Sequence, residues 1–322
     1  MRRWWVASLS LTFVAACSPG DGGGSDPATA RRCAPGATLT LAYNDNTVIE
    51  DQGKIMGSRI DGERRRVVRA DNYAYAPDFS PDGSKLVFTT ARNGETGSSA
   101  GFSRQDLYVI DSTGKNERPL TEGHLDEDPA WSPDGRWIMF VRGYSSKKGG
   151  IYKVRPDGSQ LHEVVPRPEP LRPHSPVWSL DGKEIAWAQW NIEDEGPTQV
   201  WTASAEGSGR RMVAELDQIY TISWSPDGET LAASPGRAGA VYLIDIDSGN
   251  AEILVEGASG AEWSADGSHL YYWRKIGDPG NESNILERRD MRTGERQSVE
   301  GTGHPWFLYR GFDVEPLPCA LR

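Results

Sequence analysis

The sequence predicts an all-β chain folded as a six-bladed β-propeller. Three observations lead to this prediction: a recurring hairpin phrase, its spacing along the chain, and short alternating strands between the copies. The phrase is clearest at residues 129–140, which read PAWSPDGRWIMF. Its proline pre-sets the first angle of a turn, its aspartate bonds nearby backbone, and its glycine takes the positive φ that closes the turn.

Further copies of the phrase start at Pro77, Pro176, Ile222 and Ala261. The aromatic residues that end their first strands lie 52, 47, 46 and 39 residues apart: Phe79, Trp131, Trp178, Trp224 and Trp263. A period of about 40–50 residues with four strands in each unit is typical of a propeller blade. Because one blade cannot bury both of its faces, neighbouring blades supply the core, and we expect these aromatic residues in it.

The segments between the copies follow the same pattern. Short runs of alternating apolar residues predict a third strand in successive blades, at residues 107–110, 151–154, 200–203 and 241–244. Tight turns rich in Gly and Asp follow these runs and lead into fourth strands. No helix is predicted after residue 16.

The sixth blade is expected to combine strands from both ends of the chain. Residues 38–43 have the pattern of a second strand with no first strand before it, and strands at 55–60 and 64–68 follow. The missing first strand is expected at residues 305–307, Pro-Trp-Phe, which repeat the Pro-x-aromatic start of residues 129–131. Closing the propeller by pairing N- and C-terminal strands would remove an exposed sheet edge.

Residues 1–16 have the features of a signal peptide. Two arginines precede an apolar segment of 13 residues, which is too short to span a bilayer. The segment ends in VAAC at residues 14–17, which resembles a bacterial lipobox. That resemblance implies cleavage before Cys17, a diacylglycerol on its sulfur and, because Ser18 follows, an outer-membrane destination in a Gram-negative cell, otherwise the cell surface. The alternative is an ordinary signal peptide in which Cys17 is incidental.

Residues 17–32 are then expected to form a lipidated, flexible tether, because Gly, Ser and Pro leave nothing to bury. Residues 33–322 are expected to form the propeller. Cys33 and Cys319 stand near its two ends. In an exported, oxidising setting an even pair of cysteines predicts a disulfide, and two free thiols are the alternative.

The charge of the chain limits its partners. The formal net charge is −11, and removing the +2 of residues 1–16 leaves −13 for the mature chain. An acidic chain argues against nucleic-acid binding, which needs basic patches to neutralise phosphates. It also argues against attraction to anionic lipid, so the membrane is expected to be reached through the acyl chain alone.

The full repeat resembles the WD-like repeats of the TolB family. Leu120-Thr121 is followed eight residues later by PAWSPDG at residues 129–135. That family comprises six-bladed propellers of the bacterial envelope that bind other proteins, so the resemblance implies a binding module in the envelope. It covers roughly residues 38–314. TolB carries an additional N-terminal α/β domain, where this chain has only the tether.

The ligand-binding face is expected opposite the Ser-Pro-Asp-Gly turns, where long and varied loops gather, because binding residues concentrate on loops held by a rigid scaffold. Equivalent positions before the Pro-x-aromatic start should surround the mouth of the central channel on that face. The predicted ligand-binding residues are Tyr75, Glu127, Asp128, His174, Tyr220 and His304. Hydrogen-bonding groups around a stacking surface suit a protein, peptide or glycan better than an apolar ligand. The alternative is that these residues only satisfy strand-end backbone groups and hold channel water.

No cofactor and no metal site are expected. Residues 97–101, GSSAG, match a nucleophile elbow but lie in a loop without its strand-turn-helix context. The histidines that a propeller lyase would use for a metal are His124, His174 and His304. A six-bladed ring puts the latter two on opposite blades, whereas one metal needs donors at about 2.0–2.1 Å. We therefore expect a monomeric binding module, with a propeller lyase or hydrolase acting in the channel mouth as the alternative.

Overall fold

The computed structural model describes residues 17–18, 32–33, 41–45, 54–58, 66–69, 74–90, 105–143, 149–167, 170–191, 196–236, 239–264, 266–277, 283–299 and 312–314. All regular elements within these residues are β-strands, which confirms the expected all-β class. Among them there is no helix of the length and apolarity needed to span a membrane.

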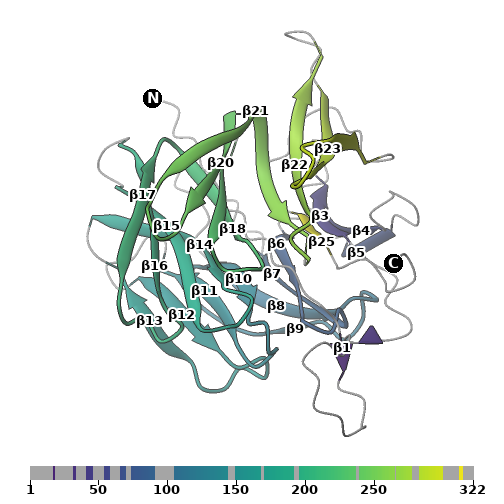
Figure 1. Ribbon diagram of the computed structural model, residues 1–322. Coiled ribbons are helices and arrows are strands. Elements are labelled where there is room, and N and C mark those ends of the chain that lie inside the picture. Colours follow the sequence, from purple (N-terminus) through teal and green to yellow (C-terminus); the bar gives the residue numbers. More distant parts are fainter. Residues whose placement is uncertain are drawn as a thin grey trace, which may run out of the picture.

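The strands are numbered along the chain (Figure 1). Their bounds are β1 Cys17–Ser18, β2 Arg32–Cys33, β3 Leu41–Asp45, β4 Lys54–Ser58, β5 Arg66–Arg69, β6 Ala74–Phe79, β7 Lys85–Thr90, β8 Asp106–Asp111, β9 Arg118–Pro119, β10 Asp126–Trp131, β11 Ile138–Arg142, β12 Gly150–Val154, β13 His162–Pro166, β14 Leu171–Trp178, β15 Glu184–Asn191, β16 Thr198–Ser204, β17 Arg211–Leu216, β18 Ile219–Trp224, β19 Thr230–Pro235, β20 Gly239–Asp245, β21 Ala251–Trp263, β22 His269–Ile276, β23 Ser283–Asp290, β24 Arg296–Ser298 and β25 Phe312–Val314.

Three sheets are simple antiparallel meanders of four strands, β6 to β9, β10 to β13 and β14 to β17. The strand predicted third in each of them is β8, β12 and β16. The first strands of successive sheets contact one another, β6 with β10, β10 with β14 and β14 with β18, and they lie near the middle of Figure 1. Consecutive sheets therefore pack face to face, with their first strands innermost.

The next sheet contains seven strands, from β18 to β24, because β21 serves two units. The first part of β21 pairs with β20 as an outer strand, up to Ala258 opposite Gly239. Its second part, from Ala258 to Trp263, pairs with β22 as a first strand. The strand thus passes from one four-stranded unit to the next without an intervening loop.

A further four-stranded sheet joins segments from the two ends of the chain, in the order β25, β3, β4, β5. In its ladder Phe312 pairs with Tyr43 and Val314 with Leu41. The described segment beside β3 is therefore Phe312–Val314, whereas the first strand was expected at residues 305–307. Residues 305–307 themselves lie outside the described residues.

The Ser-x-Asp-Gly turns have the predicted chemistry. After β10, Ser132 Oγ donates to Asp134 Oδ1 at 2.6 Å, and the N–H of Arg136 donates to the same oxygen at 2.9 Å. Gly135 has a φ of 69°, and a Cβ there would lie 3.5 Å from the Pro81 ring in the preceding sheet. The same pair of bonds recurs at Asp82, Asp181, Asp227 and Asp266. These aspartates are turn formers, as expected.

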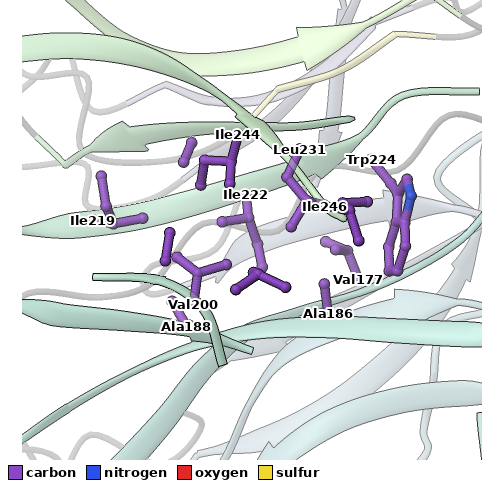
Figure 2. Close-up of a cluster of buried hydrophobic side chains, with 13 residues drawn as sticks. Val177, Ala186, Ala188, Val200, Ile219, Ile222, Trp224, Leu231, Ile244 and Ile246 are labelled. Carbon is purple, nitrogen blue, oxygen red and sulfur yellow. The ribbon is translucent and has the colours of Figure 1, made fainter. Parts of the chain in front are cut away.

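The core lies between neighbouring sheets. Figure 2 shows one such layer, in which Trp224, Ile222 and Leu231 of one sheet pack against aliphatic side chains of the sheet before it. The expected aromatic residues are all buried: Phe79, Trp131, Trp178, Trp224 and Trp263. Because each interior layer is shared by two sheets, a sheet alone would leave its apolar faces in water.

Candidate functional site

The candidate site lies at the ends of the first strands farthest from the Ser-x-Asp-Gly turns. In β10, Trp131 pairs with Ile138 beside the turn, whereas Glu127 pairs with Val141 at the other end. Tyr75 and His174 occupy the same place in β6 and β14, opposite Thr89 and Ala188 respectively. The repeat therefore brings these side chains to one end of successive sheets.

A β-bulge follows each of these positions. Ala76, Asp128 and Ser175 have positive φ values of 48°, 55° and 48°, and the strand register shifts across each of them. Aspartate tolerates this left-handed conformation better than alanine does, because its side chain can bond nearby backbone. The bulges bend the first strands and re-aim the side chains at their ends.

Hydrogen bonds cross from sheet to sheet at this level. Asp128, which is 0% exposed, accepts the N–H of Ser175 through Oδ2 at 3.1 Å. Ser175 in turn donates its hydroxyl to the carbonyl of Tyr220 at 2.6 Å. The carboxylate of Asp128 therefore supports the next sheet, which is the structural role that the sequence left open for it.

The other predicted residues are more enclosed than the rim of an open channel would require. Tyr75 is 1% exposed and Glu127 is 4% exposed. Next to Glu127, Asp126 forms a buried, bidentate ion pair with Arg142, with both N–O distances at 2.8 Å. This pair holds the end of β10 against β11 and fixes the backbone that carries Glu127.

His174, Trp190 and Tyr220 form a triangle of rings. The ring centroid of His174 lies 5.9 Å from Trp190 and 5.9 Å from Tyr220, and the latter two lie 5.6 Å apart. His174 is 5% exposed, whereas Trp190 and Tyr220 are partly exposed. Gly236 lets the backbone approach Tyr220, since a Cβ there would lie 3.1 Å from its ring. The histidine is thus the most enclosed of the three rings.

Burial, and then the positive charge of Arg172, lower the pKa of His174 to about 3. The imidazole is therefore neutral near pH 7, with one nitrogen as donor and the other as acceptor. Neither His174 nitrogen has a hydrogen-bond partner among the described residues, and the same holds for Nε1 of Trp190. Buried polar atoms of this kind are uncommon in native proteins and need a partner such as a ligand group or water.

Trp190 and Arg172 were not predicted from the sequence. Arg172 lies two residues before His174 on β14, and it pairs with Trp190 on β15. Trp190 ends the second strand rather than the first, so a search confined to the Pro-x-aromatic start passes over it. A search of second-strand ends would have found it.

His304 and Cys319 lie outside the described residues. Cys17 and Cys33 belong to β1 and β2, where their backbones pair. His124 is exposed in the connection before β10. Within the residues that the structure describes, no group of three or more His, Cys, Asp and Glu side chains is arranged to hold a metal.

Residues 40–169 match a family model described as the TolB beta propeller domain. The resemblance to TolB-type propellers is confirmed. The crystal structure of TolB from Acinetobacter baumannii matches with a TM-score of 0.65 at 18% identity, covering 86% of this chain and 67% of that one. At this identity the likeness supports the fold, not a shared activity.

Two curated relatives illustrate the range of the sequence matches. An uncharacterized protein of Agrobacterium fabrum, Atu1656, is 27% identical over 229 residues, which cover 62% of this chain and 75% of that protein. The Tol-Pal system protein TolB of Rickettsia canadensis is 33% identical over 100 residues, covering 29% of this chain and 22% of TolB. The match to TolB thus spans only a part of that protein.

Proposed function

We propose that residues 33–322 form a closed ring of six four-stranded blades. The sixth blade consists of β25, β3, β4 and β5. This closure is supported by the antiparallel pairing of β25 with β3, and by the contacts of β25 with β6 on one side and β21 on the other. A closed ring leaves no open face at either end of the series of sheets.

We propose that this propeller is a binding module for a protein, peptide or glycan of the bacterial cell envelope. One observation carries the proposal: polar and aromatic side chains gather at one end of successive first strands, and His174 there lacks hydrogen-bond partners among the described residues. The opposite end is formed by short turns that satisfy their own polar groups. A ligand is therefore expected at the first end, with Tyr75, Glu127 and Tyr220 contributing.

The site favours a binding role over a catalytic one. A catalytic site needs a nucleophile or a general base held within reach of a substrate. His174 is buried and neutral, and neither of its nitrogens bonds to a carboxylate of the described residues that could orient it as a base. A metal-dependent lyase remains testable by metal analysis of the purified protein, in which a stoichiometric transition metal would contradict the binding proposal.

The chain is proposed to be exported and to carry a lipid on Cys17, with residues 18–32 as the tether. It would then lie on the periplasmic side of the outer membrane in a Gram-negative cell, and at the cell surface otherwise. We propose further that Cys33 and Cys319 form a disulfide and that the protein is a monomer.

Crosslinking in intact cells, followed by purification and mass spectrometry, tests the binding role. The full chain should yield a specific envelope partner, and Glu127→Gln should reduce its recovery. Asp134→Asn, in a turn at the opposite end, is the matched control and should leave recovery unchanged. Equal recovery with all three proteins would contradict the proposed site.

A further inference from the structure

Two cysteines stand opposite each other in the short ladder formed by β1 and β2. The two strands pair antiparallel, and their register places Cys17 opposite Cys33 and Ser18 opposite Arg32. The cysteines therefore share one register position, although 15 residues separate them along the chain. Lipid attachment, the role proposed for Cys17, does not call for this juxtaposition.

The register meets the backbone requirement for a disulfide. Residues directly opposite each other in an antiparallel pair have Cα atoms about 4.5–5.5 Å apart and share one face of the ladder. A disulfide usually joins Cα atoms about 4.4–6.8 Å apart, and a separation above about 7 Å cannot be bridged without backbone movement. Joining Cys17 to Cys33 therefore requires no rearrangement of β1 or β2.

We infer that Cys17 and Cys33 form a disulfide when the chain meets an oxidant without a lipid on Cys17. The oxidant is itself a disulfide, such as oxidised glutathione or the oxidised form of a thiol oxidoreductase. One cysteine thiolate attacks it and releases a thiol, and the second thiolate then attacks the resulting mixed disulfide and releases another. Two electrons and two protons pass from the cysteines to the oxidant, whose disulfide becomes two thiols.

Distance along the chain favours this bond over the proposed Cys33–Cys319 bond before the chain folds. Cys17 lies 16 positions from Cys33, whereas Cys319 lies 286 positions from it. The probability of closing a flexible loop falls as about the 3/2 power of its length. In the unfolded chain Cys33 therefore meets Cys17 roughly 75 times as often as it meets Cys319. The shorter loop closes first.

Lipid attachment would decide between the two partners of Cys33. A diacylglycerol on the sulfur of Cys17 removes the thiol from exchange, so Cys33 is left to pair with Cys319. Without the lipid, Cys17 occupies Cys33, and Cys319 remains a free thiol. The choice of partner uses the proposed lipid and the proposed Cys33–Cys319 bond, whereas the Cys17–Cys33 bond depends on neither of them and not on the binding function.

The test follows disulfide formation in the full, unlipidated chain. Protein produced in a reducing cytosol is denatured and transferred into a buffer of reduced and oxidised glutathione. Samples are alkylated at intervals, digested with trypsin without reductant and analysed by mass spectrometry. Arg31 and Arg32 lie between Cys17 and Cys33, so trypsin separates the two cysteines unless a disulfide joins them. We expect the Cys17–Cys33 peptide to appear at least about tenfold faster than the Cys33–Cys319 peptide.

A shifted cysteine separates the effect of the ladder from that of chain distance. In a Cys319→Ser background, the double change Cys17→Ser with Ser18→Cys moves the thiol by one residue, to the position opposite Arg32. Neighbouring residues of a strand lie on opposite faces, so the shifted cysteine does not share the face of Cys33. The equilibrium constant for disulfide formation with glutathione should fall about tenfold or more relative to Cys319→Ser alone.

Absence of a Cys17–Cys33 peptide from the unlipidated wild type would overturn the inference, whether Cys33 is then alkylated or linked to Cys319. Equal equilibrium constants for the original and the shifted cysteine would also overturn it, because chain distance alone would then join the two residues. Other results bear on separate proposals. A Cys17–Cys33 peptide from membrane-bound protein would contradict the lipid anchor, and a Cys17→Ser variant without a Cys33–Cys319 peptide would contradict that second disulfide.

Discussion

The backbone N–H of Trp131 donates to Oδ2 of Asp78 across 2.6 Å, from the first strand of one sheet to the first strand of the sheet before it. A related bond joins Trp263 N–H to the hydroxyl of Ser223 at 3.3 Å. Such bonds tie neighbouring sheets together at their inner edges, deep in the protein. They therefore fix the spacing of the strand ends that carry the candidate site.

We predict that Asp78→Ala destabilises the protein by about 1.5–3 kcal/mol, because it leaves the buried N–H of Trp131 without its carboxylate acceptor. Chemical denaturation gives the free energy of unfolding directly. Asp247→Ala, at an exposed turn, is the control and should cost less than about 0.5 kcal/mol. An equal effect of the two substitutions would mean that the bond between the sheets contributes little.

His174 should make stability depend on pH in the acid range. Its pKa is lowered from 6.5 to about 3 in the folded protein, first by burial and then by Arg172. Below pH 6.5 His174 binds a proton in the unfolded chain but not in the folded protein. The free energy of unfolding therefore falls as the pH drops toward 3. Above pH 6.5 both states are neutral and the contribution vanishes.

Denaturation of the wild type and of His174→Gln at pH 7 and pH 4.5 measures this effect. Carboxylates also titrate over part of this range. The quantity to compare is therefore the loss of unfolding free energy between pH 7 and pH 4.5 in each of the two proteins. The variant should lose less stability on acidification, by at most about 1.4 kcal/mol per pH unit. Equal losses in the two proteins would show that His174 binds its proton equally well in the folded and the unfolded state.

Replacement of Cys17 by serine should release the protein from membranes. The expected reason is loss of the thiol that would carry the acyl chains, which on this account are the only attachment to lipid. Fractionation of cells expressing wild type and Cys17→Ser gives the partitioning, and Cys33→Ser serves as a control that should remain bound. Unchanged membrane association of Cys17→Ser would rule out the anchor.

Non-reducing digestion should yield one peptide that links Cys33 with Cys319. In the chain-entropy model, closing so long a loop stabilises by at most about 5 kcal/mol, so reduction should lower the melting temperature. Mass spectrometry before and after reduction identifies the linked peptide. Complete alkylation of both thiols in the native, unreduced protein would contradict the bond.

Much of the fold could be predicted because the Ser-x-Asp-Gly turn, which forms through contacts between near neighbours in the sequence, is repeated. Ser132, Asp134 and Gly135 fold their turn through contacts within six residues, so the sequence alone reveals it at each repeat. The buried aromatic residues follow from the same register. The pairing of Phe312–Val314 with β3 was not predicted from the sequence, because it depends on contacts between the two ends of the chain and not on a local repeat.

The candidate site was less predictable, because it depends on packing between sheets. The positions of Tyr75, Glu127 and His174 follow from the repeat, but their burial does not. The role of Asp128 depends on a bulge and on the Ser175 backbone of the next sheet. Trp190 joins the site because its ring meets His174 of its own sheet and Tyr220 of the next sheet. Sequence periodicity gives positions along a strand and carries no information about such contacts.

The most direct test of the account is the affinity of the full chain for its crosslinked envelope partner, measured for variants at the two ends of the first strands. Tyr75→Phe with Glu127→Gln keeps the packing of both buried side chains and changes their polar groups, so it should weaken binding about tenfold while leaving folding intact. Asp134→Ala should lower the free energy of unfolding by about 1 kcal/mol and leave affinity unchanged. If Asp134→Ala weakens binding and the double variant does not, the site lies at the turns and the account is wrong.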